Sequence, residues 1–334
     1  MRPFVAVLLL LAPLCTYGQS QPEGLNFVMP HGPGKITVTL TDGWTPQSIA
    51  LYDEGTRPVI GTVNKATKLD ASYILFPNDT GAATAESCRD AVVDVILKSI
   101  DTNGVIKDQN RTTRTLKDGR SIAVATYLLA KMGDMEVKQQ ELFGFFGDKN
   151  TCAEIHISKA LATPADVKLF DTAVERFAYS PDYTPTSQDY GSMATLLFAN
   201  AHDPKAAAYF YRSALDTLPD TEIAGYDAVT LRRVLTDQLS MSYGMSGDLK
   251  RSREVNEAAI TKDPLYPLYY YDLACADAEA GNAAAARTHL EQAYARRANI
   301  LKGETMPDAS KDDSILKLKS NKEFWAFVES LPKN

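Results

Sequence analysis

Residues 203–219 read DPKAAAYFYRSALDTLP, and this stretch carries the pattern that decides the fold of the C-terminal part. Ala207, Tyr211 and Ala214 follow one another at spacings of four and three, and Pro219 comes five residues later. Such spacings place side chains on one face of a helix, and proline ends a helix because it lacks the backbone N–H. The pattern predicts a helix that packs a small–large–small face and stops near Pro219.

The same spacing returns twice further along the chain, 45 and then 34 residues on. The equivalent positions are Ser252, Asn256, Ala259 and Pro264 in the second copy and Ala286, Leu290 and Ala293 in the third. The preceding helices also align, with Leu239 matching Leu273. A helix pair that recurs with a 34-residue offset predicts helical hairpins stacked in series.

Residues 188–301 resemble the tetratricopeptide repeat (TPR), a helix–turn–helix unit with small, aromatic, small and proline positions. Small residues let the two helices approach closely, and the large residue fills the gap between them. Ser252, Asn256 and Gly191 depart from the family pattern, and an ordinary amphipathic bundle is the alternative. The resemblance implies an all-α TPR solenoid, which is a binding architecture and not a catalytic one.

The C-terminal tail, residues 308–331, looks like the closing segment of bacterial TPR proteins, in which a short helix covers the last hairpin. Phe324, Phe327, Val328 and Leu331 supply an apolar face for this helix. The end of a solenoid needs such a cover because its last hairpin has no neighbour. We therefore expect a C-terminal capping helix.

Residues 25–180 combine strand patterns with helix patterns. Residues 35–40 alternate apolar and polar side chains, as a half-buried strand does. Four runs between residues 110 and 158 are joined by Gly/Asp turns, which is typical of an antiparallel meander. Residues 84–99 change to a helical period. We expect an α+β domain, mainly antiparallel sheet with packed helices, and a Pro-containing linker over 181–187.

A second helix is expected to close this domain. Thr163 has the properties of an N-cap, Pro164 suits the first helical position, and Asp166 can reach back to the cap. Val167, Phe170, Val174 and Phe177 would then form its buried face.

Residues 1–18 have the pattern of a secretory signal peptide, with Arg2, an apolar run over 4–14, and small residues at 16 and 18. The apolar run is too short to span a bilayer, which needs about 20 residues. We therefore expect an exported protein, periplasmic or extracellular, without stable membrane insertion. In an oxidising compartment, two of Cys88, Cys152 and Cys275 can pair.

The arrangement of strands and helices in residues 25–180 resembles the PsbP-like α/β/α sandwich of small exported proteins. In such a domain, Cys88 at a helix start and Cys152 at a strand start are expected to form a disulfide. Cys275 lies in a repeat helix where a side chain of alanine size is wanted, and it is expected to be a core thiol.

No familiar catalytic or metal-binding motif is visible. The four histidines, His31, His156, His202 and His289, lack metal-ligand spacing, so we interpret His156 as a surface or satisfied strand residue and His289 as an exposed helix residue. A net charge of −7 without basic clusters argues against nucleic acid as a partner. We expect no enzyme, no metal and no cofactor.

The predicted function is protein–protein interaction through the hairpins, with a protein or peptide as the partner. Leu268 and Tyr271 lie on the face that lines a TPR groove, and Asp237 and Met241 lie on the corresponding face one repeat earlier. Aromatic side chains are good anchors for a peptide. The alternative is a small-ligand or lipid-binding module in residues 25–180, with the repeats as a docking handle.

Overall fold

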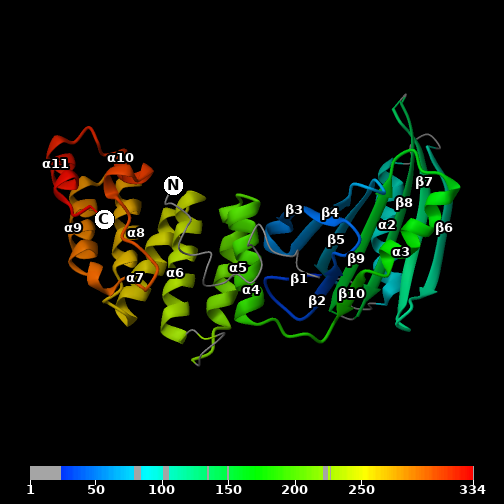
Figure 1. The fold of residues 1–334 in the computed structure, drawn as a ribbon, viewed down its shortest axis with the longest axis horizontal. Helices are drawn as coiled ribbons and strands as arrows, with labels where there is room; N and C mark the ends of the chain where they lie inside the picture. The colour runs from blue at the N-terminus through cyan, green and yellow to red at the C-terminus, as the bar shows by residue number, and fades with distance from the viewer. Residues whose placement is uncertain are drawn as a thin grey trace. The chain divides into compact units, whose positions relative to one another are not determined.

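The computed structural model describes residues 24–78, 84–100, 105–133, 135–148, 150–220, 225 and 227–333 (Figure 1). The chain forms two compact units, one ending at Pro185 and the other beginning at Thr186. The first unit is an antiparallel sheet domain with packed helices and the second is helical, which is the expected order of an α+β and an all-α part. The expected signal peptide lies outside the described residues.

A seven-stranded antiparallel sheet dominates the first unit, in the order β3-β4-β5-β9-β8-β7-β6. Its strands are β3 (Trp44–Tyr52), β4 (Arg57–Asn64), β5 (Leu69–Pro77), β6 (Ile106–Thr115), β7 (Ser121–Met132), β8 (Met135–Gly147) and β9 (Thr151–Lys159). A three-stranded sheet contains β1 (Gly24–Val28), β2 (Lys35–Thr39) and β10 (Phe177–Ser180). The 3-10 turn η1 (Asp53–Gly55) joins β3 to β4.

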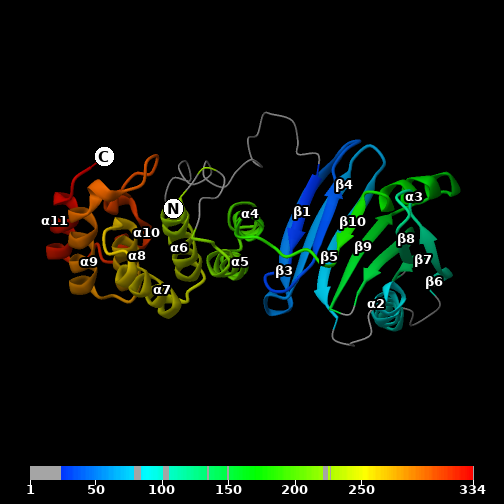
Figure 2. The same cartoon turned by 90° about the horizontal axis from the view of Figure 1, so that it is seen from below.

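The two faces of the seven-stranded sheet have different covers. Tyr73 and Phe146 point toward the small sheet, where the ring of Phe177 lies 6.0 and 5.2 Å from theirs. The opposite face carries helix α2 (Ala85–Ile100), which packs mainly on β7 and β8 (Figure 2). Side chains alternate between the faces along each strand, so every second residue of β9 belongs to the α2 face.

The closing helix differs from its prediction at both ends, and Val167, predicted on its buried face, is exposed. The expected capping box between Thr163 and Asp166 is present, on a 3-10 turn η2 (Pro164–Asp166) that leads into α3 (Val167–Val174). Phe177 was predicted on the buried face of this helix, and that prediction was wrong. Phe177 opens β10 and pairs with Val38 of β2 instead. Buried side chains in β10 alternate with period two, which suits a strand.

The second unit is a series of helices in which each packs against the next. They are α4 (Ser187–Thr195), the π-helical turn η3 (Leu196–Asn200), α5 (Pro204–Asp216), α6 (Ala228–Met245), α7 (Leu249–Lys262), α8 (Pro267–Glu279) and α9 (Ala283–Ala295). Asp203, Asp227, Asp248 and Asn282 are side-chain N-caps of α5, α6, α7 and α9. Helices α6 and α8 also contact each other directly. The turns are therefore fixed locally by capping residues.

The tail folds back onto the last hairpin. After the 3-10 turns η4 (Arg297–Asn299) and η5 (Ala309–Lys311), the short α10 (Asp313–Leu316) packs on α8 and α11 (Lys322–Ser330) packs on α9. Phe324 and Val328 are buried, and Phe327 and Leu331 pack at the edge of the same core. No helix in the part of the chain that the structure describes is long and apolar enough to cross a membrane.

Candidate functional site

The helical unit buries the positions that repeat in the sequence. All three positions of the first copy and of the third copy are buried, namely Ala207, Tyr211, Ala214, Ala286, Leu290 and Ala293. In the second copy, Ser252 and Asn256 are buried and Ala259 is partly buried. The repeated face is therefore the packing face of α5, α7 and α9.

The second hairpin has a polar cluster where the third has an apolar one. Asn256 Nδ2 donates to Ser240 Oγ at 2.5 Å, and the Ser240 and Ser252 hydroxyls lie 2.9 Å apart. The buried Asn256 Oδ1 has no hydrogen-bond partner. The corresponding third-copy residues are Ala274, Ala286 and Leu290. Buried polar atoms stabilise a fold only when they are all satisfied, so the middle hairpin is packed less favourably than its neighbour.

A buried carboxylate ties the last three helices of the array together. Asp277 of α8 accepts hydrogen bonds from Arg253 of α7 and from His289 Nδ1 of α9, the latter at 2.6 Å. His289 was predicted to be exposed, and that prediction was wrong because this bond draws the ring toward Asp277 and leaves its side chain 21% exposed. This arrangement is a structural ion-pair network.

The four predicted groove residues lie on α6 and α8, which are in contact with each other. Asp237, Leu268 and Tyr271 are buried, and Met241 is partly buried. Asp237 and Met241 occupy the positions on α6 that Tyr271 and Cys275 occupy on α8. Cys275 Sγ lies 3.7 Å from Asp312 Oδ1, next to the start of α10.

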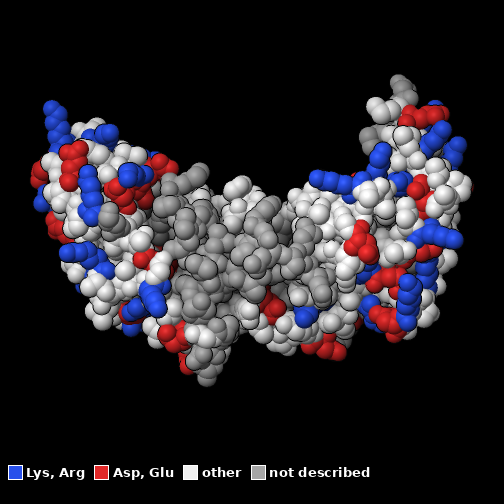
Figure 3. Space-filling model, viewed as in Figure 1, with Lys and Arg blue, Asp and Glu red and all other residues white. Residues whose placement is uncertain are grey.

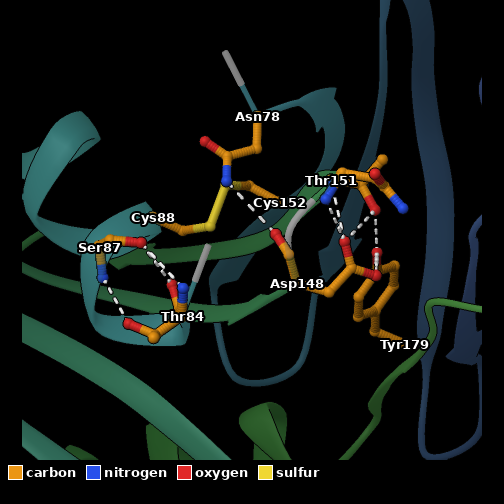
Figure 4. The surroundings of a disulfide bond; sticks show 9 residues. Asn78, Thr84, Ser87, Cys88, Asp148, Thr151, Cys152 and Tyr179 are labelled. Atoms are coloured by element: carbon orange, nitrogen blue, oxygen red, sulfur yellow. Dashed lines mark hydrogen bonds between the residues drawn. A yellow bond between two sulfur atoms is a disulfide. The ribbon is translucent and has the colours of Figure 1, made fainter. Parts of the chain in front are cut away.

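The disulfide joins α2 to the sheet, and Figure 4 shows its surroundings. Cys88 and Cys152 form the expected bond, with Cα atoms 5.8 Å apart across a sequence separation of 64. Thr84 and Ser87 cap the helix reciprocally, each backbone N–H donating to the other's hydroxyl. This cap fixes the start of α2 and brings Cys88 over β9. A buried disulfide fits a protein that folds in an oxidising compartment, as an exported protein does.

Next to the disulfide, a second set of contacts fixes the turn between β8 and β9 (Figure 4). Asp148 accepts hydrogen bonds from the backbone N–H groups of Asn150 at 2.7 Å and Thr151 at 2.8 Å. The Tyr179 hydroxyl bonds Thr151 and donates to Asp148 at 3.3 Å. Burial raises the pKa of Tyr179, so this hydroxyl stays neutral and serves as a structural link.

A cluster of ionisable side chains lies on the α2 face of the sheet, and the meeting of its members across two strands was not predicted from the sequence. His156 Nε2 lies 2.7 Å from Glu141 Oε2 on the neighbouring strand β8. The Phe143 ring stacks on the imidazole with centroids 4.2 Å apart, and Gln139 donates to the second Glu141 oxygen at 2.7 Å. His156 is therefore a satisfied strand histidine, one of the two alternatives that its sequence position allows.

Glu154 lies two residues before His156 on the same face of β9, and only 4% of it is exposed. Its cross-strand neighbours are Ile74 of β5 and Phe145 of β8, which are apolar. Burial raises the pKa of Glu154 to about 7, against the smaller opposing influence of His156 and Arg57. It is therefore the chemically most unusual carboxylate in the first unit, and perturbed groups of this kind gather at functional sites.

Elsewhere the charge is dispersed. Figure 3 shows Lys and Arg side chains interspersed with Asp and Glu on the face of the molecule that it draws. Among the residues that the structure describes, no three His, Cys, Asp or Glu side chains are grouped so that they could hold a metal ion.

Comparisons with known proteins add little to this geometry. No family model matches the chain, and no curated protein matches it. Among solved structures, it is similar to the solution structure of PsbP (CyanoP) from Synechocystis sp. PCC 6803, at 16% identity and a TM-score of 0.34. The match covers 51% of this chain and 100% of that chain. This likeness is too weak to support an assignment of function, so the candidate sites rest on the residues described above.

Proposed function

We propose that this chain is a non-catalytic, exported adaptor protein of the cell envelope that binds a protein or peptide through a TPR-like helical array. The observation that supports it best is the repeated packing of the hairpins, in which residues 34 positions apart play the same part in α7 and α9. Repeats of this kind build a continuous surface from the same helix of each hairpin, and that surface is what repeat proteins use for binding.

The first helix of each hairpin supplies the binding surface in this proposal. Helices α6 and α8 contact each other, so their equivalent side chains form one row across two hairpins. Met241 and Cys275 are equivalent members of that row and are both partly buried. A flexible methionine adapts to the shape of a bound peptide, which suits an adaptor.

The array is short, and this limits the kind of partner. Three hairpins followed by the α10–α11 cover offer a compact docking surface and not an extended peptide channel. We therefore favour a partner that inserts a short helix or loop, anchored by apolar side chains.

The experiment is photocrosslinking from within the full chain. A photoreactive amino acid replaces Met241 on α6, and a matched chain carries it at Val229, which is exposed on the same helix. After irradiation with cell-envelope proteins of the source organism, a discrete adduct is expected from position 241 and not from position 229. Equal adducts from both positions, or none from 241, would reject the α6 surface as the binding site.

A further inference from the structure

The seven-stranded sheet of the first unit ends in two edge strands that differ in chemistry. Among the described residues, β6 and β3 each pair with a single neighbour, and they lie at opposite edges of the sheet (Figure 1). An edge strand offers unpaired backbone N–H and C=O groups to another strand, and proteins usually block it with charged side chains, bulges or proline. Edge β6 is blocked in this way, since Lys107, Arg111 and Arg114 lie on it and its register with β7 shifts after Lys107.

Edge β3 is blocked over its first half only. Pro46 lacks a backbone N–H, and the register with β4 shifts between Pro46 and Ser48. From Ser48 to Tyr52 the strand reads SIALY, with no charge, no proline and a continuous register with β4. Ser48 is exposed, Tyr52 is 57% exposed, and the three residues between them are partly buried. We call residues 48–52 the open edge.

We propose that the open edge pairs with the open edge of a second copy of this chain, in antiparallel orientation, so that two first units share one continuous sheet. A two-fold axis perpendicular to the sheet relates the two strands, and it leaves each face of the sheet on the same side in both copies. Residues that lie opposite each other must then come from the same face, so their numbers differ by an even number. This pairing belongs to the first unit and does not depend on the adaptor function proposed for the helical unit.

Only one register pairs the whole open edge with itself. It forms three kinds of pair between the two copies, namely Ala50 with Ala50, Ile49 with Leu51, and Ser48 with Tyr52. The pair at the two-fold axis is small and lets the backbones approach, the second pair is apolar, and the third sets a small polar side chain beside an aromatic ring. Cross-strand pairs of apolar and aromatic side chains stabilise a sheet, so this register adds side-chain contacts to the backbone hydrogen bonds.

The charges next to the open edge stay apart in this register. A step to either neighbouring register brings Pro46 or Asp53 into the pairing. In the proposed register Asp53 lies opposite the uncharged Gln47 and keeps its own partner Arg57, at 3.0 Å. Like charges directly opposite each other would destabilise the pairing, and this register avoids them. The open edge is therefore complementary to itself, which favours a second copy of the chain as its partner.

The first test places charges at the two-fold axis. Sedimentation velocity of the full chain over a concentration series is expected to show a reversible dimer. Ala50→Lys and Ala50→Glu each set like charges opposite each other and should weaken the dimer at least tenfold, whereas their equimolar mixture should associate within threefold of the wild type. Mixing cannot repair a misfolded chain, so this recovery excludes a folding defect.

The control is Thr115→Lys on the blocked edge β6, which should leave the association unchanged. A wild-type chain that stays monomeric up to its solubility limit overturns the proposal. A mixture of the two Ala50 variants that associates no more tightly than either variant alone also overturns it.

The second test fixes the register by disulfide trapping in a Cys275→Ser chain, which lacks the free thiol. Opposite Cα atoms of an antiparallel pair are about 4.5–5.5 Å apart, a separation that a disulfide can bridge. Under mild oxidation Ala50→Cys should therefore form a covalent dimer by itself, whereas Ser48→Cys and Tyr52→Cys should crosslink only when mixed with each other. Failure of Ala50→Cys to crosslink, or equal crosslinking of Ser48→Cys alone, would reject the pairing of the two open edges.

Discussion

The burial of Glu154 predicts a pH dependence of stability that one substitution should remove. Burial raises the pKa of this carboxyl from 4.5 to about 7 in the folded chain. Between these pH values the folded state holds a proton that the unfolded state has lost, so stability falls as pH rises through this window. The cost is absent below about pH 4.5 and fully present above about pH 7. Glu154→Gln keeps the shape of the side chain and removes its charge.

The magnitude follows from the pKa difference. The span from 4.5 to about 7 corresponds to about 3 kcal/mol at about 1.4 kcal/mol per pKa unit. We therefore expect Glu154→Gln to stabilise the first unit by about 3 kcal/mol at pH 8 and by no more than about 1 kcal/mol at pH 5. A neutral amide lacks the desolvation cost of an ionised carboxylate, which is the physical reason for the gain at high pH.

The assay must report on the first unit alone. The chain has two tryptophans, Trp44 buried in the first unit and Trp325 in the second. In a Trp325→Phe background, urea unfolding followed by Trp44 fluorescence at pH 5 and pH 8 gives the free energy of unfolding of the first unit. If Glu154→Gln is no more stable than its parent at pH 8, or gains equally at both pH values, the account of a buried, charge-bearing Glu154 is refuted.

Three further changes test the packing. The first change replaces the polar cluster of the second hairpin by the residues of the third: Ser240→Ala, Ser252→Ala and Asn256→Leu copy Ala274, Ala286 and Leu290. This triple variant should stabilise the helical unit by about 1–3 kcal/mol, measured from Trp325 fluorescence in a Trp44→Phe chain. A loss of stability would mean that the polar cluster is favourable. Gly147→Ala should destabilise the first unit by about 2 kcal/mol, because the added Cβ would lie 2.5 Å from Cys88 Sγ and 2.9 Å from the Thr84 carbonyl oxygen. The control Gly244→Ala, in helix α6, should be neutral or slightly stabilising, because its nearest neighbour is Ser252 Oγ at 3.8 Å. Replacing Cys88 and Cys152 by serine should lower the free energy of unfolding of the first unit, measured by urea unfolding, by about 4 kcal/mol. A reductant should lower this free energy by a similar amount in the wild-type chain and leave the double variant unchanged.

The sequence predicted those parts of the fold that depend on local periodicity. The face carrying Ala286, Leu290 and Ala293 was visible because its spacing is set by the helix itself, and the Thr163 capping box because its partners are three residues apart. Strand β10 was missed because it is defined by pairing with β2, a segment far away in the sequence. Phe177, for example, fits the spacing of a helix and is drawn into a strand by pairing with Val38.

The ionisable clusters could not be predicted, for a related reason. Glu141 and His156 meet because β8 and β9 pair in one particular register, with Phe143 opposite His156. The alternation of Glu154 and His156 indicates only that they share a face of the strand. Which face is buried depends on where α2 packs, and a single sequence does not supply that information. Likewise, Asp277 and His289 lie 12 residues apart on two helices whose packing brings them together.

We propose above that helix α6 of the TPR-like array binds a protein partner. The most direct measurement is the Kd of the partner recovered by crosslinking, for the wild-type full chain, for Met241→Asp and for Val229→Asp. An acidic side chain at Met241 should weaken binding at least tenfold, because it places a charge in an apolar contact, while Val229→Asp should change the Kd less than twofold. Equal affinity of the wild-type and Met241→Asp chains would contradict the claim.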